Sequence, residues 1–417
     1  MFKQRLSLIR QPFFWWVAGL LVVIASGLAA AFIILTRGLV VTNLTDLVPW
    51  GFWIGIDLSS IALSAGAFLL SAAVYLLGIK KLQPVARTAV FMGLIGYSMA
   101  VLTLMLDIGR PDRFWHSLLY WNVHSPLWEV TMCVTLYLTV LALEVTPIVG
   151  QSGWFHGRWP KLGDRMASVH KIAPVLAIVG LCLSMLHQSS LGATYGVLKA
   201  RPIWYRPGLA VLFIVSAMAA GPAMVVLAST IASKVTSRAR VDKSLLDTVA
   251  QFIGWVLVAY LYLRFWDALS MSYTYEPARS EGLFYLTKGP LALNFWIGEI
   301  VLGIVIPMVI LLNRKWRQNT RLLVLALTFV VVGLVFYRWD TNMVGQLVVF
   351  NQIPQMLTPQ YTQYRPSLIE IAAGAGIIAY GLLAFTIGVR SLGVVDHTLV
   401  EAHEEAPYVP ATAVSTD

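Results

Sequence analysis

The chain has 417 residues, of which 58% are hydrophobic and only 12% are charged, and its mean hydropathy is +0.74. This balance excludes a water-soluble protein, and the apolar runs are continuous rather than alternating, which excludes a transmembrane β-barrel. The net charge of +10 comes from basic residues in short connections between apolar runs, so it indicates membrane topology rather than nucleic-acid binding.

Apolar runs of about 20 residues, the length that crosses a bilayer as a helix, recur along the chain. They predict an all-α polytopic bundle of about ten spans over 1–395, followed by an acidic, disordered tail over 396–417. The second span exceeds one crossing and should tilt or extend beyond the lipid. The predicted spans are 13–35, 50–79, 88–106, 126–149, 171–190, 207–232, 248–272, 291–312, 321–337 and 368–392.

Lysines and arginines predict the orientation, because cytoplasmic loops carry an excess of them. The two terminal segments and every second connection hold nineteen of the thirty, and the other connections hold ten. Both termini and the acidic tail are therefore predicted on the cytoplasmic side of the cell inner membrane. Lys199, Arg201 and Arg206 break the rule on the outer side, where they could meet an acidic surface of a partner.

The outer loop 107–125 carries acids, arginines, histidines and four aromatic rings between two apolar runs. Ionisable groups at membrane depth are costly and usually mark a pathway or a site. In this chain they converge on the outer half of the predicted spans, and only Glu144, in span four, lies near an inner end. The outer group comprises Asp57, Asp107, Glu129, His187, Arg264, Asp267, Glu299 and Glu370.

Some of these groups also have a purely structural interpretation. Arg264 and Asp267 lie three residues apart on one helix face and could simply neutralise each other. Asp57 and Asp107 could cap helices or pair with the two arginines of the outer loop.

Glu129 and His187 are harder to explain in this way, because neither has an obvious partner within its own helix. They lie at similar depth on consecutive antiparallel spans, and the Tyr97 hydroxyl reaches toward that depth from span three. An imidazole can donate a hydrogen bond and relay a proton near neutral pH, and a carboxyl at membrane depth can hold and release one. The three side chains predict a proton-handling site below loop 107–125.

The sequence lacks the cysteines and the paired histidines that would bind a redox metal. Cys133 and Cys182 are too few for an iron–sulfur cluster, which needs about four thiolates. A b-type haem usually needs two histidines on facing helices, whereas His170 and His187 share one helix and lie about 25 Å apart along it. We therefore expect neither haem nor iron–sulfur cluster in this chain.

Several short motifs carry a resemblance to a known family. They include Pro49-Trp50-Gly51, Gly96-Tyr97, Asp107-Ile108-Gly109-Arg110 and His187-Gln188-Ser189-Ser190-Leu191-Gly192. With them the chain resembles the NrfD/PsrC family, most strongly over 49–192, and within it the HybB-type branch that serves hydrogenases.

The resemblance implies a haem-free membrane subunit of a respiratory oxidoreductase complex. Such a subunit binds menaquinone or ubiquinone and exchanges electrons with a four-cluster ferredoxin-like iron–sulfur subunit on the outer, periplasmic face. It implies quinone-binding positions at Tyr97, Glu129 and His187. Proton transfer is expected of Asp57, Asp107, Glu129, Glu144 and Glu299, and a supporting or interface role of Arg110, Arg113, His124 and Arg338.

Departures from the family pattern leave alternatives open. The HybB-type branch often has a glutamate where this chain has Leu227-Ala228-Ser229, so Glu144 becomes the nearest candidate for an inner proton route, with a snorkelling surface acid as the alternative. Differences within 338–367 leave the catalytic partner as either a [NiFe] hydrogenase or a molybdopterin enzyme. A proton- or ion-coupled transporter and a haem b cytochrome subunit are the rival functions, although transporter sites lie nearer the midplane.

Overall fold

The structure is a computed structural model that describes residues 12–353 and 356–397, so most of the predicted tail lies outside the described residues. Ten described helical segments are long and apolar enough to cross a membrane, which confirms the predicted all-α, multi-pass bundle. They are α2 (Pro12–Arg37), α3 with α4 (Phe52–Leu63, Gly66–Tyr75), α5 (Gln83–Asp107), α7 (Pro126–Gly150), α10 (Ala173–Gly196), α11 (Gly208–Val235), α12 (Lys243–Ser272), the π-helix η5 with α14 (Asn294–Val305, Ile306–Leu312), α16 (Thr320–Leu347) and α17 (Leu368–Ser391).

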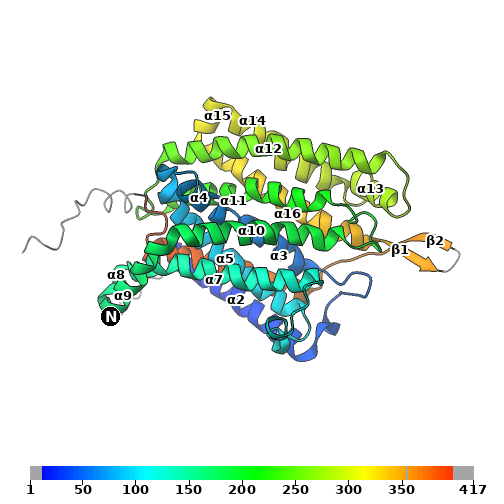
Figure 1. The fold of residues 1–417 in the computed structure, drawn as a ribbon, viewed down its shortest axis with the longest axis horizontal. Helices are drawn as coiled ribbons and strands as arrows, with labels where there is room; N and C mark the ends of the chain where they lie inside the picture. The colour runs from blue at the N-terminus through cyan, green and yellow to red at the C-terminus, as the bar shows by residue number, and fades with distance from the viewer. Residues whose placement is uncertain (1–11, 354–355, 398–417) are drawn as a thin grey trace, which may run out of the picture.

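The helices form two sets of four and one outer pair (Figure 1). In the first set α3/α4, α5, α7 and α10 pack on one another, and in the second set α11, α12, η5/α14 and α16 do so. The sets meet where α11 packs on α10 and α4, and where α16 packs on α3. Helices α2 and α17 pair with each other and lie against α5 and α3.

Helices α2 and α17 run antiparallel, because Trp16 donates to Thr386 at 3.2 Å while Asn43 donates to the Arg365 carbonyl at 2.9 Å. The start of α2 and the end of α17 therefore lie at the same end of the bundle, which we call the basic end. It also contains the connections 76–82, 151–172, 236–242 and 313–319. The connections 38–51, 108–125, 197–207, 273–293 and 348–367 make up the hairpin end, which corresponds to the side predicted as outer.

Shorter elements lie at these ends. Helices α8 (Gly153–Arg158), α9 (Pro160–Ala167) and α15 (Arg314–Gln318) lie at the basic end, and α6 (His116–Leu119) and α13 (Arg279–Thr287) lie at the hairpin end. Ser125 begins α7 by accepting from the Trp128 backbone N–H at 3.4 Å, with Pro126 as the first helical residue. This cap starts α7, the helix that carries Glu129, directly after loop 108–125.

The second predicted span, 50–79, differs from the structure. The helix is interrupted at Ser64–Ala65 and ends at Tyr75, shortly before Gly78 with its φ of +67°. The break lies where the two helical sets touch most closely: a Cβ on Gly221 would lie only 2.1 Å from the Gly66 backbone nitrogen. The helical span, from Phe52 to Tyr75, is therefore shorter than the predicted one.

The ninth predicted span, 321–337, is too short. Helix α16 continues to Leu347, and the chain then forms an antiparallel hairpin, β1 (Val348–Ile353) and β2 (Met356–Tyr361), with Val348 opposite Tyr361. In Figure 1 this hairpin projects beyond the helices. The extra helical turns contain Arg338, Asp340 and Asn342, which are polar but fully buried, so hydropathy alone ended the span too early.

The basic cluster that broke the orientation rule is mostly internal. Arg201 donates to the carbonyls of Gly345 and Leu47 at 3.1 and 2.9 Å, and Arg206 forms an ion pair with Asp267 at 2.7 Å. These two arginines therefore bind parts of their own chain, and the suggestion that they meet an acidic partner is wrong for them.

Candidate functional site

Two of the predicted site residues meet in the seam between α5, α7 and α10. Tyr97 and His187 are both fully buried, and the Tyr97 hydroxyl and His187 Nδ1 are 2.8 Å apart, within hydrogen-bonding distance. The Tyr97 ring also packs edge-on against Tyr137 of α7, with 4.6 Å between centroids. Glycine at position 96 makes this possible, since a Cβ there would collide with the Ser64 hydroxyl at the end of α3.

Glu129, the third predicted residue, joins the same seam through a serine. The Ser190 hydroxyl donates to Glu129 Oε1 at 2.7 Å, and Ser190 lies three residues after His187, on the same face of α10. Glu129 therefore has a partner, but on a neighbouring helix rather than on its own.

A row of unpartnered polar atoms continues this seam toward the basic end. Among the described residues, His187 Nε2, the Ser184 hydroxyl and the Tyr137 hydroxyl are buried and make no hydrogen bond. Ser184 lies beside the hydroxyls of both Tyr97 and Tyr137. Buried polar groups are normally satisfied, and ordered water usually satisfies those that protein atoms do not.

Ser184 and Tyr137 were not predicted as site residues from the sequence. Helical spacing could have found both: Ser184 lies three residues before His187, and Tyr137 lies eight residues after Glu129 and seven before Glu144. The whole α7 face from Glu129 to Glu144 thus carries polar groups at roughly two-turn intervals.

Glu144 lines a cavity of about 420 Å³ at the basic end, between α4, α5, α7 and the start of α10. Its polar lining includes Tyr75, Gln83, Arg87 and His170. Arg87 donates to the Leu392 carbonyl at 3.3 Å, and its buried Nε has no partner among the described residues. Glu144 and Arg87 share this cavity without forming an ion pair.

Asp57 and Asp107 are bound by uncharged neighbours. The Trp53 indole donates to Asp107 at 2.6 Å, and the Thr103 hydroxyl donates to Asp57 at 3.4 Å. The interpretation that they pair with the loop arginines is therefore wrong.

Those arginines lie on the exposed surface of the outer loop. Arg110 binds Asp112 at 3.0 Å, and this hydrogen bond lowers the pKa of the Asp112 carboxyl. Arg113 lies 4.0 Å from the same carboxylate, and His124 is exposed. The loop thus presents both charge and aromatic side chains outward, which leaves these residues accessible to a partner.

Arg338 lies deep in the bundle rather than in a loop. Its guanidinium stacks over the Phe213 ring at 3.6 Å, and Nη2 donates to the Phe213 carbonyl, to Ser216 and to Gln188. Gln188, next to His187, in turn donates to the Ile61 carbonyl at 3.1 Å. Arg338 therefore links the second helical set to the helix that carries His187.

Glu299 belongs to a buried network of charges. Arg264 binds Glu299 at 2.8 Å and Asp267 at 2.8 Å, and Asp267 also binds Arg206. Tyr260 donates to Glu299 at 3.0 Å. The predicted pairing of Arg264 with Asp267 is confirmed, within a larger neutral set of two cations and two anions.

No group of three or more potential metal ligands occurs within 12–353 and 356–397, and both cysteines are free thiols. The polar side chains of the seam are hydroxyls, an imidazole and carboxyl groups. Such groups can donate hydrogen bonds to a ligand oxygen and carry protons.

Comparison with known proteins identifies a family that the chain matches. Residues 40–350 match the family model described as polysulphide reductase, NrfD. The integral membrane subunit of a menaquinone reductase from Nitratidesulfovibrio vulgaris is 33% identical over 403 residues, covering 93% of each chain.

More distant relatives belong to other oxidoreductases. A selenate reductase subunit of Mesobacillus selenatarsenatis is 26% identical, covering 87% of this chain and 90% of the relative. A protein of Escherichia coli named as a probable Ni/Fe-hydrogenase 2 b-type cytochrome subunit is 27% identical, covering 87% and 89%. With its family match over most of its length and a 33% identical relative along nearly all of it, the chain belongs to the NrfD family of membrane subunits.

Proposed function

We propose that this chain is the quinone-reactive membrane subunit of an oxidoreductase complex in the cell inner membrane. The observation that carries the proposal is the enclosed Tyr97–His187 pair, in which His187 Nε2 is buried and has no partner among the described residues. A quinone accepts two electrons and two protons at its oxygens, so its site needs hydrogen-bond donors and a proton source. The names of the relatives, which include a menaquinone reductase, support the same substrate class.

The proposed roles follow from the atoms that each side chain offers. When the Tyr97 hydroxyl donates to Nδ1, the proton of the neutral imidazole is held on Nε2, which can then donate to a ligand oxygen. Glu129, held by Ser190 one turn away, would hold and release the proton that the imidazole passes on. Asp57 and Asp107, on the adjoining α3 and α5, would tune or relay the same protons.

We also propose a proton route from the basic end. It begins in the Glu144 cavity and follows Tyr137 and Ser184 to Tyr97 and His187, with ordered water completing the hydrogen bonds of these hydroxyls. Water can bridge such groups at little cost, and hydroxyls can both donate and accept. If electrons leave or arrive at the hairpin end while protons enter at the basic end, turnover would move charge across the membrane.

The partners would bind at the hairpin end. A four-cluster ferredoxin-like iron–sulfur subunit there would connect the quinone site to a catalytic subunit, either a [NiFe] hydrogenase or a molybdopterin enzyme. Loop 108–125 offers a suitable surface, because Phe114, Trp115, Tyr120 and Trp121 are all exposed, as is Arg110 of the same loop. Aromatic and arginine side chains are typical of the centres of protein interfaces.

Two rival functions make different predictions. An ion-coupled transporter would need unpaired carboxylates around a midplane cavity, whereas here Glu129 lies toward the hairpin end, Glu144 lines the cavity at the basic end, and Glu299 is paired with Arg264. A haem b subunit would need facing histidines. His187 instead faces Tyr97, and no other described histidine is fully buried within a crossing helix.

The test uses the purified complex with His187→Ala. We expect quinone-dependent turnover to fall by roughly two orders of magnitude or more, while the catalytic partner still reduces or oxidises a soluble dye at the wild-type rate. Glu129→Gln should lose turnover by a similar or smaller factor. Ser189→Ala is the matched control and should remain active, because Ser189 is only half-buried and its hydroxyl donates to the Leu186 carbonyl of its own helix. Wild-type quinone turnover in both site variants would refute the proposal.

A further inference from the structure

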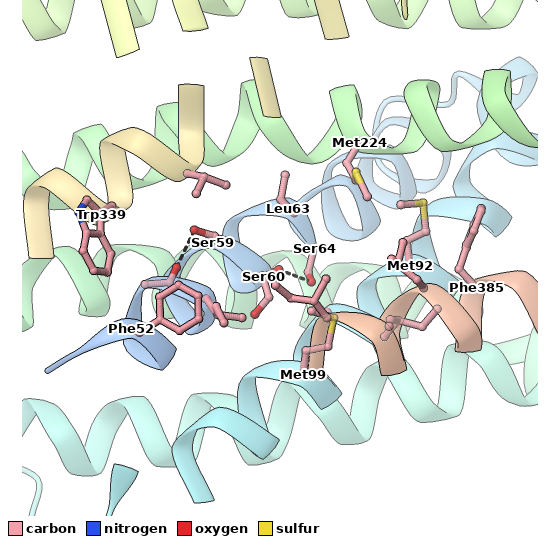
Figure 2. Close-up of a pocket in the computed structure, with 18 of the residues that line it drawn as sticks. Phe52, Ser59, Ser60, Leu63, Ser64, Met92, Met99, Met224, Trp339 and Phe385 are labelled. Carbon is pink, nitrogen blue, oxygen red and sulfur yellow. Dashed lines mark hydrogen bonds between the residues drawn. The ribbon is translucent and has the colours of Figure 1, made fainter. Parts of the chain in front are cut away.

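A second, larger cavity of about 570 Å³ lies between α3, α5, α11, α16 and α17. Figure 2 shows Phe52 and Trp339 at one end of it, Met92, Met224 and Phe385 at the other, and serines of α3 between them. None of Tyr97, Glu129 and His187 lines this cavity. It is therefore distinct from the Tyr97–His187 pair, although α5 contributes residues to both.

The cavity opens sideways, because the helices on its two sides do not pack together. Helix α17 packs on α2, α5 and α3, whereas α16 packs on η5, α11, α14 and α3, and the two make no substantial contact. The lining residues on the two sides of this gap are accessible rather than packed: Val335 of α16, and Ile378 and Leu382 of α17, are each about 40% accessible. In a membrane, that surface faces lipid chains, so the gap is a window onto the bilayer.

The lining offers almost no hydrogen bonds to a guest. The hydroxyls of Ser59, Ser60 and Ser64 already donate to backbone carbonyls of α3, at 2.7, 3.0 and 2.7 Å, and two of these bonds are drawn in Figure 2. Filling the space with water would need roughly twenty molecules at about 30 Å³ each, and most would lack partners. A quinone head group, which needs donors at its oxygens, is equally unsuited to the middle of this cavity.

Hydrocarbon, in contrast, matches the lining. Three methionines, Met92, Met99 and Met224, give flexible and polarisable walls that adapt to an irregular chain. The polar exceptions, Asn294 and the Trp339 indole, lie toward the hairpin end, where a lipid's polar portion would reach the membrane interface.

We propose that this cavity binds one long hydrocarbon chain of a membrane lipid, which enters from the bilayer between α16 and α17. Two sources share this chemistry, the acyl chain of a phospholipid and the isoprenoid tail of a quinone. Binding here does not depend on the quinone reaction at Tyr97 and His187, because the two sites share no lining residue.

The experiment measures which lipids the full-length chain retains. The wild-type protein, with whatever subunits copurify, is washed exhaustively in detergent, and the retained lipids are extracted and quantified by mass spectrometry. We expect about one retained molecule per chain. Ala228→Phe, which places a ring in the cavity, should lower its retention at least fivefold, and Ser59→Leu should do so independently.

Ile231→Phe is the matched control, because it adds an aromatic ring three residues along the same helix but on the lipid-exposed surface. It should retain the wild-type amount. A retained phospholipid identifies an acyl chain and a retained quinone identifies an isoprenoid tail. Equal retention in the wild type and in a folded cavity variant, or no retained lipid in the wild type, overturns the proposal. Should Ala228→Phe fail to fold, Ser59→Leu alone decides.

Discussion

Neutralising Glu299 should cost folding stability, because this carboxylate balances a buried arginine. Arg264 is 3% exposed and lies 2.8 Å from both Glu299 and Asp267, and Asp267 is shared with Arg206. In Glu299→Gln, two buried cations would share a single anion.

The size of the effect follows from the distances. At 2.8 Å and an effective dielectric constant near 20, the Arg264–Glu299 attraction is about 6 kcal/mol before desolvation is counted. Glutamine keeps an oxygen that can accept from Arg264 and Tyr260, and Asp267 partly compensates. The expected net loss is therefore about 3 kcal/mol, at the lower end of the cost of breaking a buried pair.

The assay is a double-mutant cycle on reversible unfolding in mixed detergent micelles, with Glu299→Gln, Arg264→Gln and the double variant. The double variant should be more stable than the sum of the single effects implies, because it leaves the neutral Arg206–Asp267 pair intact. Asp112→Asn is the control, since its pair with Arg110 is exposed and should contribute less than about 1 kcal/mol.

Glu299 was also predicted to transfer protons, and the same variants test that role. A Glu299→Gln protein that unfolds like the wild type but loses proton-coupled turnover would refute the reasoning from charge balance.

Three other outcomes follow from the structure. Glu144→Gln should impair proton uptake or driven turnover in vesicles while quinone binding survives, and unchanged coupling would exclude the route from the basic end. The purified complex should show no haem Soret band and should contain an iron–sulfur protein with several [4Fe–4S] clusters; a stoichiometric b-haem spectrum would contradict this. Burial lowers the pKa of His397, whose Nδ1 accepts from the Asp242 backbone N–H at 3.1 Å. The neutral imidazole therefore stabilises the fold above the ordinary histidine pKa near 6.5, and this stabilisation is lost as the pH falls below that value. Proteolysis near 392–397 should accelerate between about pH 7.5 and 5.5 in the wild type, but lose this pH dependence in His397→Ala.

The sequence was sufficient for features that depend on one helix at a time. Ten apolar runs correspond to ten crossing helices because each needs only length and hydropathy. Tyr97 and His187 lie on the spans before and after the one that carries Glu129, and both could be predicted to lie near that helix because consecutive helices usually pack together.

Features that depend on contacts between helices far apart in the sequence could not be predicted. The partner of Glu129 is Ser190, a residue too ordinary to single out from sequence. Arg338 was placed in a loop because its partners, Phe213 and Gln188, lie more than a hundred residues away. The interruption at Ser64 lies beside the close approach of Gly66 to Gly221, a contact between distant segments that no local pattern contains.

The outer pair of helices has a consequence for how this protein is built. The segment that matches the family model, 40–350, contains both four-helix sets but neither α2 nor α17. In a chain reduced to that segment, the faces of α3 and α5 that α17 now covers would contact the bilayer directly. The first and last helices of the chain thus cover an apolar face of α3 and α5 that would otherwise lie against lipid. That face becomes one wall of an internal cavity, which lipid can enter only from the side, between α16 and α17.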